Sequence, residues 1–87
     1  MRESKIEKAF VQRIKSIGGM CEKFTSPGRR SVPDRLVTLP NNRIVFAEIK
    51  REGEAPTPAQ LRDHARRRAL GCEVVVIDSM EAANAFV

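Results

Sequence analysis

The sequence has no tryptophan and no tyrosine, so phenylalanine supplies all of its aromatic residues, which make up 5% of the chain. Proteins that bind single-stranded nucleic acid commonly stack bases on aromatic side chains, so this composition argues against that class. No apolar run approaches the ~20 residues that span a bilayer, and the charged segment 1–10 does not resemble a signal peptide. We therefore expect a soluble intracellular protein with no membrane partner.

Cysteine and histidine are also scarce, with two cysteines and one histidine in the chain. Cys21 and Cys72 lack the close spacing of a zinc or redox motif, and neither has a neighbouring histidine. In the reducing interior of a cell such cysteines rarely form disulfides. We therefore expect both to act as small buried hydrophobic residues.

Positive charge, in contrast, is abundant, with a formal net charge of +5. Residues 1–35 carry nine Lys and Arg against four Asp and Glu, and residues 59–72 carry four against one. A basic excess without aromatic residues favours contact with the phosphate backbone of nucleic acid. A length of 87 residues leaves room for one domain, placed here at 1–87, and so small a core favours self-association.

Hydrophobic periodicity and turn residues predict an α/β protein. The predicted elements, in chain order, are a helix over 4–17, strands over 20–24, 35–39 and 44–50, a helix from Thr57 to Gly71, a strand over 73–77 and a short helix over 82–87. The order of the first six, αβββαβ, predicts a mixed central sheet flanked by helices, with a parallel crossover into the last strand. The second long helix has only a thin apolar stripe of Leu61, Ala65 and Ala69.

The predicted hairpin contains three residues that suggest chemistry. Glu48 and Lys50 lie two apart on one strand and share a face, and Asp34 precedes the neighbouring strand. If Asp34 lies across from Glu48, their Cβ atoms would be ~4.5–5.5 Å apart, so both carboxylates could hold one hard cation such as Mg²⁺. On spacing alone the simpler alternative is a turn acid at Asp34 and an exposed Glu48/Lys50 pair, because such spacing is common by chance.

The length of the hairpin loop tests this hypothesis. A two-residue turn at Asn41-Asn42 would place Asp34 opposite Ile49, on the wrong face of the sheet. An odd-length loop or a bulge would instead pair Asp34 with Glu48 or with Lys50. We therefore predict an odd-length loop or a bulge.

These segments resemble a known family. Residues 23–30 (KFTSPGRR), 32–37 (VPDRLV) and 46–50 (FAEIK), followed by Gln60, are similar to the VRR-NUC domain of the PD-(D/E)xK nuclease superfamily. The resemblance extends from about Ile6 to Asp78. It implies a restriction-endonuclease-like fold, hydrolysis of DNA phosphodiester bonds with Mg²⁺ or Mn²⁺, and a place in the cytoplasm of a bacterial or phage-infected host cell. Small stand-alone members resemble phage-type Holliday junction resolvases and are often homodimers.

The resemblance also implies roles for individual residues. Asp34 and Glu48 match the metal carboxylates, the main-chain carbonyl of Ile49 a further ligand, and Lys50 the catalytic lysine. Glu7 matches an acid of the first helix, and Gln60 a polar residue that opens the next helix. The sequence departs from the family at Ser31, where glycine is usual before Val-Pro-Asp.

Both Glu7 and Gln60 have an alternative role as helix caps. Ser4 and Glu7, and likewise Thr57 and Gln60, have the spacing of a capping box, so either side chain could serve only its own helix terminus. His64 lies one turn after Gln60 on the same face, where a surface or boundary position and a contact with substrate are both open.

Several basic residues are candidates for DNA contact. The loop from Ser26 to Arg30 could cradle phosphate through its hydroxyl and through Arg29 and Arg30, although it could equally be a solvated turn. Lys23 and Arg35 flank this loop and complete the predicted DNA-binding set. Arg66, Arg67 and Arg68 point in three directions, so we expect one or two to contact DNA or a second subunit.

The leading prediction is therefore a Mg²⁺- or Mn²⁺-dependent DNA endonuclease that acts on branched or Holliday-junction DNA. The alternative is a nuclease-like module that binds branched DNA without turnover, because charge alone explains binding. A third possibility is an interaction protein whose basic face contacts an acidic partner.

Overall fold

One four-stranded sheet organises the protein in the computed structural model, which describes residues 4–87. Its strands lie in the order β1 (Met20–Lys23), β2 (Arg35–Leu39), β3 (Arg43–Ile49) and β4 (Glu73–Ile77). The first three strands are antiparallel, whereas β4 runs parallel to β3, which confirms the predicted mixed sheet.

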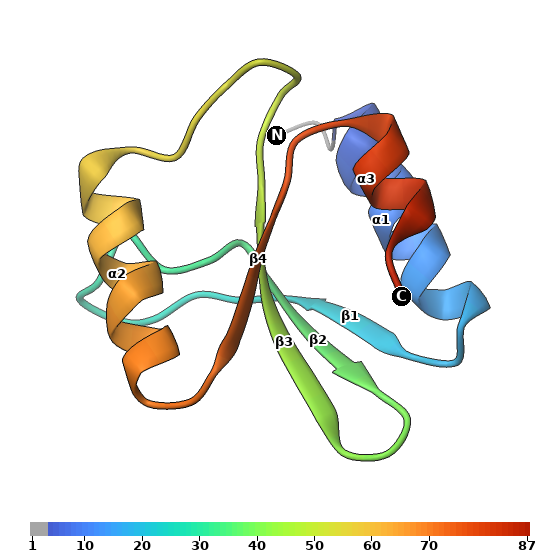
Figure 1. The fold of residues 1–87 in the computed structure, drawn as a ribbon, viewed down its shortest axis with the longest axis horizontal. Coiled ribbons are helices and arrows are strands. Elements are labelled where there is room, and N and C mark those ends of the chain that lie inside the picture. Colours follow the sequence, from blue (N-terminus) through green and yellow to red (C-terminus); the bar gives the residue numbers. More distant parts are fainter. Residues whose placement is uncertain (1–3) are drawn as a thin grey trace.

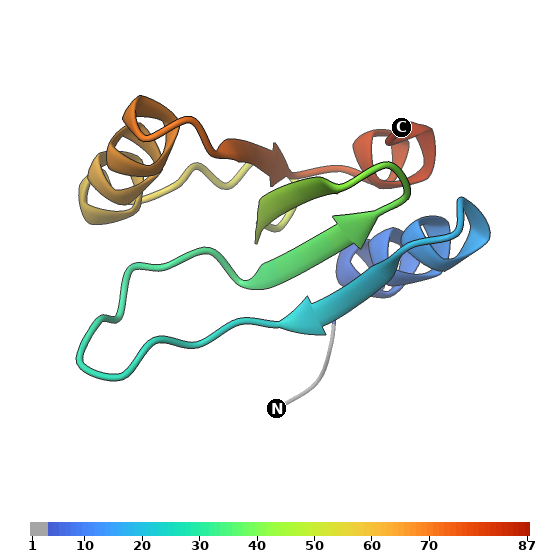
Figure 2. The same ribbon diagram turned by 90° about the horizontal axis from the view of Figure 1, so that it is seen from below.

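Helices cover both faces of this sheet (Figures 1 and 2). Helix α1 (Lys5–Ser16) packs beside α3 (Met80–Ala85), and α2 (Pro58–Ala69) lies apart from them. Ser4 caps α1 by accepting the Glu7 N–H at 3.0 Å, and Thr57 caps α2. Within residues 4–87, no helix is long and apolar enough to cross a membrane.

The hydrophobic core lies between the sheet and the α1–α3 pair. Phe10 and Ile14 from α1 meet Val37, Val45 and Ala47, all with no exposed surface. Because successive strand residues alternate between faces, Glu48 points away from this core and towards α2. The sheet thus has one apolar face and one face that carries polar groups.

The terminal helix begins two residues earlier than predicted, at Met80 instead of Ala82. Ser79 is its N-cap, because the Ser79 hydroxyl accepts the Ala82 N–H at 3.0 Å. Cys21 and Cys72 are half-buried instead of fully buried.

Helix α2 packs differently from the prediction. Its apolar residues Leu61, Ala65 and Ala69 are exposed, whereas Asp63 and His64 are its two buried residues. The polar residues find partners on the sheet and on the loop before β2, which explains how a helix with so little apolar surface can be held in place. This polar packing locates the site described next.

Candidate active site

The turn between β2 and β3 sets the position of Asp34. The loop contains three residues, since Leu39 pairs with Arg43, and its Asn41 and Asn42 both adopt left-handed φ values, of 65° and 62°. Arg35 pairs with Ala47, so the next position along places Asp34 beside the Glu48–Ile49 segment, where Asp34 Oδ2 accepts the Ile49 N–H at 2.8 Å. The predicted odd-length loop is confirmed.

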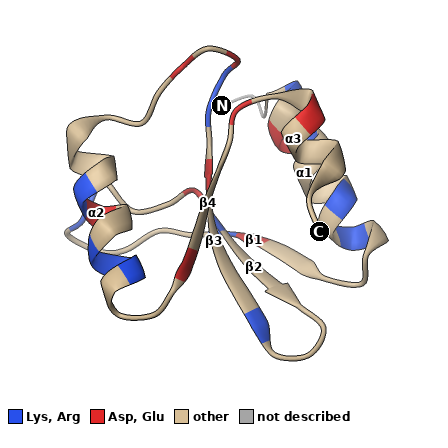
Figure 3. Ribbon diagram, viewed as in Figure 1, with Lys and Arg blue, Asp and Glu red and all other residues tan. Residues whose placement is uncertain are grey.

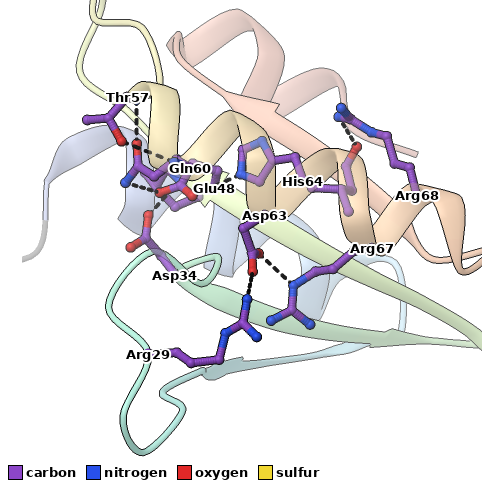
Figure 4. A network of polar contacts seen from close by, with 11 residues as sticks. Arg29, Asp34, Glu48, Thr57, Gln60, Asp63, His64, Arg67 and Arg68 are labelled. Carbon is purple, nitrogen blue, oxygen red and sulfur yellow. Dashed lines mark hydrogen bonds and ion pairs between the residues drawn. The ribbon is translucent and has the colours of Figure 1, made fainter.

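Glu48 lies at the centre of a polar network (Figure 4), with 1% of its surface exposed. His64 Nε2 lies 3.1 Å from Oε1, and Gln60 Nε2 lies 3.4 Å from Oε2. Burial raises the pKa of Glu48 to about 8; the hydrogen bond and negative charge of Asp34 add to this effect, and Lys50 opposes it. Without a cation, Glu48 is therefore mostly protonated at pH 7.

This arrangement suits a hard divalent ion. Two carboxyl groups are close enough for one to raise the pKa of the other, and a cation between them would let both ionise. Carboxylate and carbonyl oxygens are the ligands that Mg²⁺ and Mn²⁺ prefer. The oxygen donors at Asp34 and Glu48 thus fit the ion that the sequence predicts.

An open cleft of about 500 Å³ lies beside Asp34. Asp34, Ile49 and Lys50 line it together with Glu7 and Lys23. Lys50 directly follows β3, and its main-chain N–H is fixed by the Ile77 carbonyl at 2.9 Å. The predicted acids, the predicted ammonium and a substrate-sized opening therefore occur at one end of the sheet.

Glu7 lines this cleft, but its carboxylate is paired with Arg35. Its carboxylate accepts a hydrogen bond from Arg35 Nε at 2.9 Å, so it is turned towards Arg35 instead of back to its own helix terminus. Among residues 4–87, no three Asp, Glu, His or Cys side chains converge as a metal cluster. The groups that could coordinate a metal ion directly are therefore the carboxylates of Asp34 and Glu48 and the main-chain oxygens beside them.

Gln60 combines the two roles that the sequence left open. Its Oε1 accepts the Thr57 N–H at 2.9 Å and its own N–H donates to Thr57 Oγ1 at 3.1 Å, which completes the capping box. The remaining Nε2 group faces Glu48. One side chain thus starts α2 and contacts the buried carboxylate.

His64 is neither a surface residue nor placed to touch substrate, because its side chain is fully buried. Burial, followed by the charge of Arg68, lowers the pKa of His64, so the ring is neutral at pH 7 and its Nε2 shares a hydrogen bond with Glu48. His64 Nδ1 is a buried atom that has no hydrogen-bond partner among residues 4–87. The spacing of His64 from Gln60 indicated that the two share a helix face, but nothing in the sequence indicated that the ring is buried.

The predicted DNA contacts divide into exposed and buried residues. Lys23, Arg29 and Arg30 are exposed, and Ser26 is half-buried with its carbonyl accepting the Arg29 N–H at 3.1 Å. Arg35, however, is only 5% exposed and pairs with Glu7. This placement does not fit the predicted phosphate contact, and Arg35 instead holds an acid at the wall of the cleft.

The role of Asp63 was not predicted from the sequence. This residue is 4% exposed, and it bonds Arg29 on the loop at 3.2 Å and Arg67 on its own helix at 2.7 Å. Arg67 in turn lies over the Phe46 ring, 4.7 Å from its centroid. Only the i, i+4 spacing of Asp63 and Arg67 was visible beforehand.

Known proteins are similar to this chain over nearly all of its length, although no family model matches it. The chain is 56% identical over 84 residues to "Putative nuclease p44" of Acyrthosiphon pisum secondary endosymbiont phage 1, covering 97% of this chain and 90% of that relative. A solved structure of a VRR_NUC domain superimposes with a TM-score of 0.87 and 37% identity, covering 92% of this chain and 87% of that one.

Proposed function

Because the chain belongs to the VRR-NUC family of nucleases, we propose that it is a Mg²⁺- or Mn²⁺-dependent DNA endonuclease. The observation that carries the proposal is that Asp34 and Lys50 line one open cleft, while the buried Glu48 carboxyl group hydrogen-bonds to Asp34. In the family to which the chain belongs, this set would hydrolyse phosphodiester bonds.

Each residue has a physical role in this proposal. Asp34, Glu48 and the main-chain oxygen of Ile49 would hold the ion, with Glu7 acting through water. When bound, the ion would provide a water of lowered pKa and stabilise negative charge on the phosphate. Lys50 would orient the attacking water or neutralise charge that develops on the phosphoryl oxygens. His64 and Gln60 would keep the Glu48 carboxylate in a fixed orientation.

Branched DNA is the proposed substrate, and a homodimer the proposed active species. A twofold pair of small subunits would present two clefts to two symmetry-related strands. This part of the proposal is supported by the family resemblance to junction resolvases.

The proposal is tested with labelled junction, flap and duplex DNAs in Mg²⁺, in Mn²⁺ and in EDTA. We expect metal-dependent cleavage, fastest on the junction. Glu48→Ala and Lys50→Ala should each lower the rate by about 10²-fold or more. Matched controls are Glu81→Ala and Lys8→Ala, which remove the same charges at exposed positions that do not line the cleft.

Two results would contradict the proposal. One is the absence of cleavage of every DNA with either metal, which would favour the DNA-binding module without turnover. The other is cleavage that Glu48→Ala and Lys50→Ala leave unchanged, because the activity would then come from another site or another protein.

A further inference from the structure

A second hollow, of about 200 Å³, lies between the loop before β2 and helix α2. The loop contributes Arg29, Arg30 and Ser31, and the helix contributes Ala59, Arg62, Asp63 and Arg66. We call these seven residues the arginine pocket. The helical residues recur at steps of three, one and three, so they form one stripe facing the loop.

The charges of the arginine pocket do not cancel. Its one acid, Asp63, is already shared between two partners, Arg29 and Arg67. Arg30, Arg62 and Arg66 are exposed, and none of them makes an ion pair within residues 4–87. Three unpaired guanidinium groups around one hollow would repel each other unless an anion lay between them.

The walls of the arginine pocket are held in place. Asp63 joins the loop to the helix through Arg29, and Arg67 lies over the rings of Phe46 and Phe24, at 4.7 and 5.4 Å from their centroids. Figure 4 shows Arg29 and Arg67 both reaching the Asp63 carboxylate. The loop therefore presents its arginines from a fixed position, which reduces the ordering that binding would require.

The chemistry of the lining indicates the ligand. Arginine forks match phosphate oxygens in two-point contacts, and the Ser31 hydroxyl can add a further hydrogen bond. Within the described part of the chain, no aromatic side chain lines the hollow, so these residues offer no platform for a base. Contacts of this kind bind the backbone without reading sequence.

The arginine pocket also has a direct structural connection to the catalytic carboxylates. Its loop continues into Asp34, and the adjacent stripe of α2 carries Gln60 and His64, which contact Glu48. Figure 3 shows the basic residues gathered along this helix. A strand cleaved at Asp34 and Glu48 could therefore reach the arginine pocket by following the loop.

We propose that the arginine pocket binds a backbone phosphate of the DNA outside the cleavage position. The inference rests on the proposed function only in that it takes DNA as the ligand. It adds a substrate-positioning site, built by Arg62 and Arg66 together with the loop arginines, to a cleft that performs the chemistry.

The experiment compares the wild type with Arg62→Ala/Arg66→Ala. Binding of a short fluorescein-labelled duplex is followed by anisotropy in EDTA over a series of salt concentrations. The matched control is Lys8→Ala/Lys15→Ala, which removes two exposed charges from α1, on the other face of the sheet. Circular dichroism checks that all three proteins are folded.

We expect the arginine variant to bind about tenfold more weakly, since each charge-assisted hydrogen bond contributes substantially to affinity. The slope of log affinity against log salt should become less steep by about 0.9 for each phosphate that the variant no longer neutralises. The lysine control should change the slope by less than half as much. In cleavage assays the variant should raise KM and leave kcat near that of the wild type.

An unchanged slope in the arginine variant, or an equal reduction of the slope in the lysine control, would overturn the inference. The two proposals fail separately, because binding is measured without metal. A wild type that cleaves DNA while the arginine variant binds normally would refute only the arginine pocket. A wild type that cleaves nothing while the arginine variant shows the reduced slope would refute only the nuclease.

Discussion

Replacing Glu48 by glutamine should stabilise the protein when no metal is present. In the folded chain the pKa of Glu48 is raised from 4.5 to about 8, chiefly by burial and then by Asp34. Between these values the folded state keeps a proton that the unfolded state has released. The free energy of unfolding therefore falls as pH rises, by up to about 1.4 kcal/mol per pH unit, and this decline ends above the folded pKa.

Integrated from the ordinary pKa up to pH 7, the decrease is about 3 kcal/mol. Glutamine cannot ionise, and its amide can donate to Asp34 while its oxygen accepts from His64. Some of the gain will be offset where the new amide group faces Gln60. We expect a net gain of about 2 kcal/mol at pH 7, which for a domain of this size is a rise in Tm of roughly 10 °C.

The assay is thermal unfolding in EDTA at a series of pH values between about 5 and about 9. The wild type should lose stability with rising pH, whereas Glu48→Gln should lack most of this slope. Glu73→Gln is the matched control, because the hydrogen bond from Arg43 lowers the pKa of Glu73 and the same substitution there should destabilise slightly. The reasoning is refuted if Glu48→Gln is folded but less stable than the wild type at pH 8.

Three further predictions concern the same network. Binding of Mn²⁺ at pH 7 should release close to one proton, as measured by calorimetry in two buffers. The apparent affinity for Mn²⁺ should rise about tenfold per pH unit up to about pH 8. An affinity that does not change with pH would contradict the raised pKa of Glu48. His64→Ala should lower the free energy of unfolding by about 2–4 kcal/mol and weaken Mn²⁺ binding by about 10- to 100-fold. His64→Gln keeps a hydrogen-bond donor and should restore much of the metal affinity. Equal Mn²⁺ affinity in the wild type and both variants would refute a positioning role for His64. Asp63→Asn should release Arg29 and make the loop before β2 more sensitive to trypsin. The control is Asp78→Asn, which makes the same substitution at an exposed position. Equal digestion of the two variants would show that Asp63 does not hold the loop.

The fold was predictable from the sequence because local signals agreed with one another. The stripe Ile6, Phe10 and Ile14 marked α1 and its buried face, and Thr57 with Pro58 marked the start of α2. The terminal helix was placed two residues late because the cap at Ser79 was overlooked. The odd number of residues in the β2–β3 loop was predicted from a chemical requirement, namely that Asp34 and Glu48 share a face.

The polar interior of the site was not predictable in the same way. Hydrophobic patterning places apolar residues inside, so it suggested Leu61 for the packed face of α2 and left His64 either at the surface or boundary or in contact with substrate. In the structure, the carboxylate of Glu48 makes a polar residue the better partner at that face. Arg35 and Glu7 illustrate the same limit, because a buried pair between two distant segments leaves no periodic signal in the sequence.

The three-residue turn Pro40–Asn42 has a consequence for how such chains can diverge. Substitutions there are absorbed locally, as two asparagines with positive φ already supply an unusual backbone that glycine could also provide. A single-residue change in the length of the turn can also be absorbed, because Leu39 can stay paired with Arg43 while the loop becomes longer or shorter. An insertion or deletion within β2 or β3 is different, because it would shift Asp34 by one position relative to Glu48 and turn it to the other face. Relatives that keep the chemistry should therefore vary in the composition and length of this turn, but keep equal numbers of residues between Asp34 and Leu39 and between Arg43 and Glu48, or compensate a difference with a bulge.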